Sequence, residues 1–229
     1  TGYTNGTYVE CVPTALGAYP WPPPDRHIHR PSCWNESFAD SGFDTITMTE
    51  TNFYWNTRAP SDGFPEAGAR LVRQVRGVYP DIPVYLYEHW PPFEEFRMSA
   101  WIDTHHVTYH QWFARVQDLI NQQSPGADVR LIPVGWIFAR LLAPGRPLAG
   151  MTNDDLFVDV DPHGTGTTYY ISGLIHYMAL FQKRPPANMT VPSYVHPTVR
   201  NNIAAVVDFA WNELLDMVDE SGNSRVFGP

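Results

Sequence analysis

The chain has 229 residues, 43% of them hydrophobic, and a formal net charge of −9. This length suits one domain with a sizeable core, and the acidic balance disfavours nucleic acid and anionic membranes as partners. No run of about 18 apolar residues is present, so we expect no transmembrane segment. The sequence assigns no compartment; we expect a soluble chain, and export is compatible with it because a mature exported protein has lost its signal peptide.

Apolar runs and helical periodicity alternate along the sequence. In chain order the predicted elements are helix 7–16, strand 43–49, helix 65–78, strand 82–88, helix 100–121, strand 129–134, helix 137–142, strand 156–160, and helices 169–181 and 199–218. Near-continuous apolar strands between helices are typical of a parallel sheet covered on both faces. Functional sites in such sheets form beyond the carboxyl ends of the strands.

The stretch 155–177 carries the strongest chemical signal. Asp159 and Asp161 lie in and just after an apolar run, and His163 follows in a turn framed by proline and glycine. A carboxylate shortly before a histidine in a tight loop can orient the imidazole and stabilise its protonated form. That is the acid–base half of a serine–histidine–acid relay. The spacing leaves open which of the two acids reaches His163.

Three local features resemble the SGNH (GDSL-like) hydrolase superfamily. The segment from Asp159 to His163, followed by Gly-Thr-Gly and a helix, is similar to the family's last block, where Asp and His share one loop. A predicted strand ends in Asn52 and looks like the block whose Asn donates to the oxyanion. The runs 84–90 and 132–135 are similar to strand ends in bacterial members.

The resemblance spans residues 43–182 and implies one domain, 1–229, with a three-layer α/β/α flavodoxin-like sheet. The chain departs from the family at the Gly-Asp-Ser nucleophile block, which has no match. Ser41 precedes a predicted strand, the wrong side for a nucleophile elbow, and Ser172 lies within a predicted helix. Residues 1–6, followed by a predicted helix, look like those that come just after such a block, so we expect an upstream segment or a partner chain to supply the first strand.

The resemblance implies a serine ester hydrolase, acting as a deacetylase on a small ester or an acetylated carbohydrate. His163 would be the general base and acid, oriented by Asp159 or Asp161, and Asn52 would donate to the oxyanion. No cofactor and no metal ligand are assigned in this scheme. Aromatic residues near the predicted strand ends, Tyr54, Trp55 and Trp90, are candidates for binding a sugar or acyl group, and they could equally be core residues.

Two alternatives remain open from the sequence. A catalytically inactive relative would keep the fold and bind a glycan or a protein; the missing serine favours it and the Asp/His loop disfavours it. A metal-dependent hydrolase would use His105, His106 and His110, because histidines four apart on a helix can share a face. The glutamate of a His-Glu-x-x-His motif is missing, which favours a solvated helix start over a zinc site.

Overall fold

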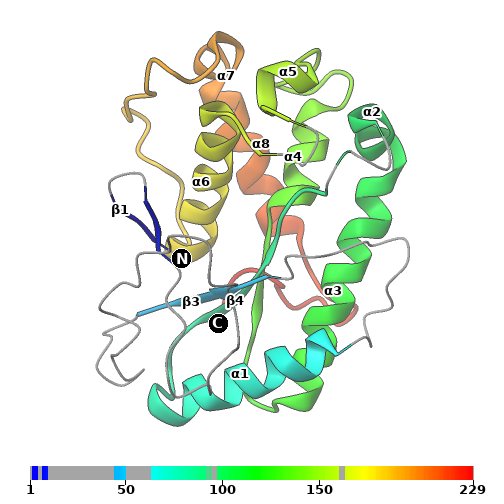
Figure 1. The fold of residues 1–229 in the computed structure, drawn as a ribbon, viewed down its shortest axis with the longest axis vertical. Coiled ribbons are helices and arrows are strands. Elements are labelled where there is room, and N and C mark those ends of the chain that lie inside the picture. The colour runs from blue at the N-terminus through cyan, green and yellow to red at the C-terminus, as the bar shows by residue number, and fades with distance from the viewer. Residues whose placement is uncertain are drawn as a thin grey trace, which may run out of the picture.

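Three parallel strands carry helices on both faces in the computed structural model (Figure 1). The structure describes residues 2–4, 7–9, 44–49, 63–91, 93, 97–159 and 163–228. The strands are β3 (Ile46–Met48), β4 (Val84–Glu88) and β5 (Arg130–Pro133), in the order β3-β4-β5. All three were predicted as apolar runs, and their parallel pairing confirms the α/β class.

Burial on both faces of the sheet explains why its strands are apolar without alternation. In β4, Tyr85 belongs to one core cluster, whereas Val84 and Leu86 belong to the other. The same division appears in β5, where Ile132 and Leu131 face opposite clusters. The hydrophobic core is therefore two layers, one on each side of the sheet.

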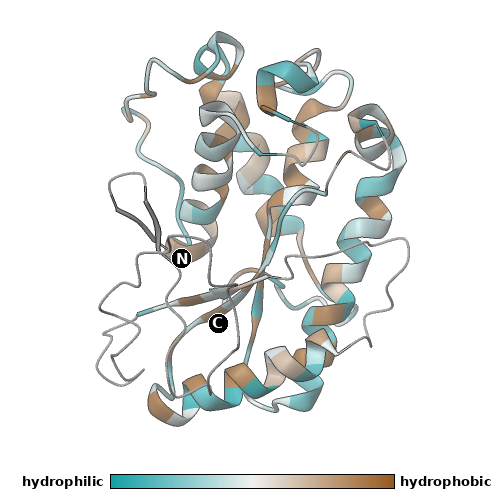
Figure 2. Cartoon of the chain, in the orientation of Figure 1, coloured by the Kyte–Doolittle hydropathy of each residue, from teal (hydrophilic) through white to brown (hydrophobic). Residues whose placement is uncertain are grey.

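Helices α1 (Phe64–Val78) and α3 (His106–Gln123) cover one face. Proline in the first turn of α1 suits a helix start, because its missing N–H has no intrahelical partner there. The helix then buries one stripe, including Val72 and Val75, against α3 and the sheet. Hydrophobic and hydrophilic bands alternate along α1, as an amphipathic surface helix requires (Figure 2).

Helices α4 (Val134–Leu142), α6 (Gly166–Phe181) and α8 (Ile203–Asp216) cover the opposite face. Helix α4 follows β5 without a linking residue, and most of its side chains are buried. A helix that is apolar nearly all round belongs inside a core. The predicted helix 199–218 is divided at Asn202 into α7 (Pro197–Asn201) and α8.

The predicted fourth strand at 156–160 is wrong over 156–159, the part of it that the structure describes. The structure instead has a short helix, α5 (Asn153–Leu156), followed by an isolated antiparallel bridge between Phe157 and Gly164. Thr152 and Asp155 form a capping box, in which the Asp155 carboxylate accepts from the Thr152 backbone N–H at 2.8 Å. The capping box satisfies backbone N–H groups at the start of α5 that have no partner within the helix. The helix is therefore favoured at this point, although the apolar run that follows it is typical of a strand.

The predicted helix at 7–16 is also wrong where the structure describes it. Residues Gly2–Thr4 (β1) and Thr7–Val9 (β2) form an antiparallel pair. Threonine, tyrosine and valine favour strands, and the intervening Asn5-Gly6 is a common hairpin dipeptide in sequence. Preference for a pleated strand thus outweighs the helical spacing of the apolar residues.

The predicted helix at 100–121 begins with α2 (Met98–Ala100) and a π-helical turn, η4 (Trp101–His105), before α3. Single π-helical turns inside helices are rare and often lie near functional sites. No helix in the described ranges is both long and apolar enough to cross a membrane.

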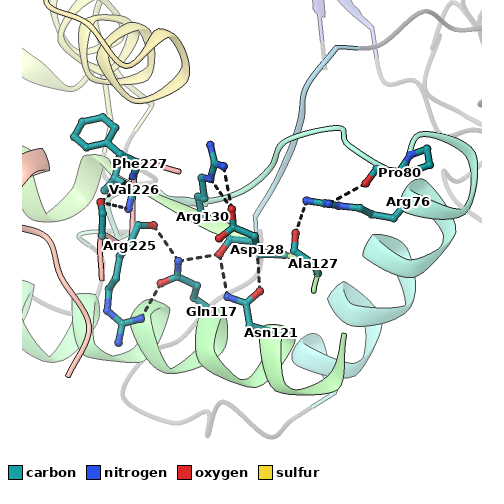
Figure 3. A network of polar contacts seen from close by, with 12 residues as sticks. Arg76, Pro80, Gln117, Asn121, Ala127, Asp128, Arg130, Arg225, Val226 and Phe227 are labelled. Atoms are coloured by element: carbon teal, nitrogen blue, oxygen red, sulfur yellow. Dashed lines mark hydrogen bonds and ion pairs between the residues drawn. The ribbon is translucent and has the colours of Figure 1, made fainter. Parts of the chain in front are cut away.

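The C-terminal segment is fixed to β5 and α3 by polar contacts (Figure 3). The Leu131 N–H donates to the Arg225 carbonyl at 2.7 Å, and the Arg225 guanidinium donates to Gln117 and Asp118, each at 2.8 Å. Gln117 in turn donates to the Val129 and Arg225 carbonyls. These contacts satisfy backbone groups at the edge of β5 that would otherwise need water.

Candidate functional site

The loop between α5 and α6 lies beyond the carboxyl ends of the strands (Figure 1). This loop carries the predicted acid–base pair. The Val158 N–H donates to the His163 carbonyl at 2.8 Å, and the Thr165 N–H donates to the Leu156 carbonyl at 2.7 Å. Together with the bridge from Phe157 to Gly164, these bonds close the loop at its base. These bonds therefore fix the stem from which the described residues Asp159 and His163 extend.

Asp159 holds His163 through both of its carboxylate oxygens. Oδ2 of Asp159 lies 2.7 Å from Nδ1 of His163, and Oδ1 accepts the His163 backbone N–H at 3.0 Å. Because Nδ1–H donates to the acid, the lone pair of the neutral ring is on Nε2. No described residue forms a hydrogen bond with His163 Nε2, and the His163 and Asp159 side chains are 64% and 42% exposed. The ring can therefore accept a proton from a group approaching from outside.

The remaining predicted site residues differ in where they lie. Asp161, Asn52, Tyr54 and Trp55 lie outside the described residues. Trp90 is only 8% exposed and packs against three other rings, with centroid separations of 5.9–6.3 Å, in Phe138, Phe157 and Tyr169. Trp90 is therefore a core residue beneath the His163 loop and not the open face of a binding pocket.

A second acid–histidine pair, which the sequence did not predict, joins Glu88 to His110. Glu88 Oε2 lies 2.6 Å from His110 Nδ1, and Glu88 Oε1 accepts the Trp136 backbone N–H at 2.7 Å. The Glu88 side chain is fully buried and that of His110 is 12% exposed. The His110 ring also packs against the Trp136 indole, with centroids 4.8 Å apart. This pair connects the end of β4, the first turns of α3 and the start of α4.

The histidines weighed as metal ligands do not converge. His110 is paired with Glu88, and Nδ1 of His106 lies 3.0 Å from the Trp101 carbonyl. Burial lowers the pKa of His106, partly offset by that bond to Trp101. Within the described ranges, no group of three histidine, cysteine or acidic side chains is placed to hold a metal ion. The metal-dependent alternative therefore has no assembled ligand set in this part of the chain.

Ser172 is buried in α6 beside Tyr87 and His176. Burial raises the pKa of Tyr87 to about 12, an effect reduced by its hydrogen bond with Ser172. His176 Nδ1 lies 2.9 Å from the Ser172 carbonyl and 3.5 Å from the Ser172 hydroxyl, and burial lowers its pKa. Since Nδ1–H donates to the carbonyl, the same nitrogen cannot act as a base toward the hydroxyl. Ser172 is therefore a structural residue, as its predicted place in a helix indicated.

Comparison of the chain with protein-family models, curated proteins and solved structures found no match in any of the three. The functional interpretation therefore depends on the geometry of the site.

Proposed function

We propose that the protein is an ester hydrolase of the SGNH type, in which Asp159 and His163 are the acid–base pair. The observation that carries the proposal is the 2.7 Å contact at Nδ1 of an imidazole whose Nε2 has no hydrogen-bond partner in the described residues. A base oriented by an acid on one nitrogen and open on the other is the arrangement that activates a hydroxyl nucleophile. The parallel sheet supports a flavodoxin-like, three-layer arrangement for the whole domain.

In this mechanism a serine hydroxyl attacks the ester carbonyl while Nε2 of His163 takes its proton. The imidazolium, stabilised by the Asp159 carboxylate, then protonates the departing alkoxide, leaving an acyl-enzyme. Water attacks the acyl-enzyme with His163 again as the base, which releases the acid and restores the serine. No described serine contacts His163, so we place the nucleophile outside the described residues. Asn52 is proposed as a donor to the oxyanion.

The test uses the full-length natural protein. A fluorophosphonate should add once, as measured by intact mass, and p-nitrophenyl esters should be hydrolysed. By analogy with other relays, His163→Ala should reduce kcat by about 10⁶-fold and Asp159→Asn by roughly 10⁴-fold. His196→Ala is the matched control, because His196 also faces an aspartate, Asp155, at 3.5 Å. Absence of adduct and turnover, or full activity in His163→Ala, would overturn the proposal.

One observation favours a second candidate, a non-catalytic binding module of the same fold. The described part of the chain holds no serine in contact with His163, as a relative without its nucleophile would also show. The fluorophosphonate measurement separates the two functions, because a module without an activated serine forms no adduct.

A further inference from the structure

An apolar groove of about 690 Å³ runs along the outer face of α6. One wall consists of residues on one face of α6, from Gly166 to Tyr177. The other wall comes from the segment that returns beside α6 (Figure 1), and consists of Pro185, Pro186, Met189 and Tyr194. No acid, lysine, arginine or histidine is among the described residues that line the groove. The lining thus offers hydrophobic contact and a few tyrosine hydroxyls.

Two glycines give the groove its shape. Gly166 lets the Tyr194 ring approach closely, because a Cβ at this position would lie 2.8 Å from that ring. Gly173 is exposed in the middle of α6, and a Cβ added there would have no atom within 4 Å. A glycine inside a helix lowers stability relative to alanine. At Gly173 no described neighbour requires the absence of a side chain; its effect is to leave the groove open.

The groove begins where the proposed catalytic loop ends. Gly166, the first residue of α6, follows His163 by three positions. Tyr169 lines the groove and also packs against Trp90, which contacts Phe157 at the base of the loop. From Gly166 to Tyr177 the helix extends about 16 Å at 1.5 Å per residue. One end of the groove, at Gly166, therefore adjoins the C-terminal side of the His163 loop.

We propose that this groove binds the acyl chain of the ester, so that medium-chain acyl esters are preferred over acetyl esters. The inference rests on the proposed hydrolase function. It differs from the expectation of a deacetylase in that the preferred ester carries an acyl group longer than acetyl. The lining favours an alkyl chain because burying methylenes needs only apolar contact. A glycan would need an array of hydrogen-bond partners, but tyrosine hydroxyls are the only polar side-chain groups in the described lining. An anion would need a cation, and the described lining has none. Tyr169 and Tyr194, 52% and 66% exposed, keep the groove accessible.

Binding can be tested without turnover by comparing octanoate with butanoate, which share a carboxylate and differ by four methylenes. Each buried methylene tightens binding by up to about fourfold, so octanoate should bind at least tenfold and up to about 200-fold more tightly. Gly173→Phe would fill the groove and should abolish this difference. Gly77→Phe is the matched control, because Gly77 is an exposed glycine of α1 whose Cβ would also have no neighbour within 4 Å.

Calorimetric binding to the full-length protein and kcat/KM for p-nitrophenyl octanoate and butanoate give separate results. A chain-length preference in wild type and Gly77→Phe, lost in Gly173→Phe with Tm unchanged, supports the acyl groove. If that binding preference is found without any ester turnover, the groove stands as an acyl-chain site and the hydrolase function fails. If esters are hydrolysed but Gly173→Phe keeps the wild-type preference in binding and turnover, the acyl groove is wrong and the hydrolase function stands. Equal binding of octanoate and butanoate to the wild-type protein also overturns the acyl groove.

Discussion

Replacing Glu88 with alanine should destabilise the fold far more than replacing Asp159 with alanine, although each carboxylate contacts a histidine at almost the same distance. The contacts are 2.6 Å to His110 and 2.7 Å to His163. The difference is burial, since Glu88 and His110 are enclosed while Asp159 and His163 face solvent. Water screens the second pair and replaces its hydrogen bonds when one partner is removed.

The magnitude follows from what alanine leaves behind. Removing one partner of a buried pair costs about 3–5 kcal/mol, because the other partner stays desolvated. Here Glu88→Ala leaves both the His110 ring and the Trp136 backbone N–H without their acceptor. An exposed pair contributes about 0–1 kcal/mol, so Asp159→Ala should change the free energy of unfolding by no more than that. In a domain of this size, 3–5 kcal/mol lowers Tm by roughly 6–20 °C.

Urea unfolding of the two variants and of Glu88→Gln measures the difference through the midpoint and slope. Glutamine keeps an acceptor for the Trp136 N–H and can donate to a neutral His110, so Glu88→Gln should cost only about 1–2 kcal/mol. Asp159→Ala should unfold like wild type while losing the proposed ester turnover. Equal losses of stability for Glu88→Ala and Asp159→Ala would refute the argument that burial decides the role of each pair.

Two further predictions concern stability. Gly135→Ala should lower the free energy of unfolding by about 1–3 kcal/mol, because its Cβ would overlap the His89 carbonyl oxygen. Gly173→Ala, whose Cβ would lie in open space, should raise it by about 0.5–1 kcal/mol. Urea midpoints of the two variants that move in the same direction would contradict this prediction. Burial lowers the pKa of His106 and His176 below 6.5, so below pH 6.5 the unfolded chain binds more protons and stability falls with falling pH. The double variant His106→Gln/His176→Gln should therefore have a flatter Tm–pH curve below pH 6.5, and an unchanged slope would contradict this origin.

The parts of the fold that could be predicted are those in which local pattern and tertiary burial agree. The apolar runs at β4 and β5 are buried on both faces, so their composition matches their place in the sheet. The strand predicted at 156–160 was wrong over its described residues, because a capping box at Thr152 starts a helix just before it. The helix predicted at 7–16 was wrong over Thr7–Val9. There the preference of the residues for a strand outweighed the apparent helical spacing of the apolar side chains.

The two acid–histidine pairs differ in the same way. Asp159 and His163 are four residues apart, so their contact is local. The sequence pattern predicted that an acid orients His163 but left open whether this acid is Asp159 or Asp161. Glu88 and His110 are separated by 22 residues, and meet only because β4 and α3 pack together. The spacing of His106 and His110 indicated a shared helix face, but not what lies opposite it. The sequence did hold one indication of this pair, the acid Glu88 at the end of an apolar strand. An acid that is buried with such a strand needs a partner.

The buried pair and the exposed loop are linked through Trp90. Glu88 holds the end of β4 to α3 and α4, and Trp90 follows two residues later in the chain. The Trp90 ring packs against Phe157 and Tyr169, which lie on either side of the loop that carries His163. A reactive group on a loop is positioned accurately only when rigid elements support it from beneath. In the proposed hydrolase, the network around Glu88 would therefore affect turnover by fixing the stem of the His163 loop, without touching the substrate.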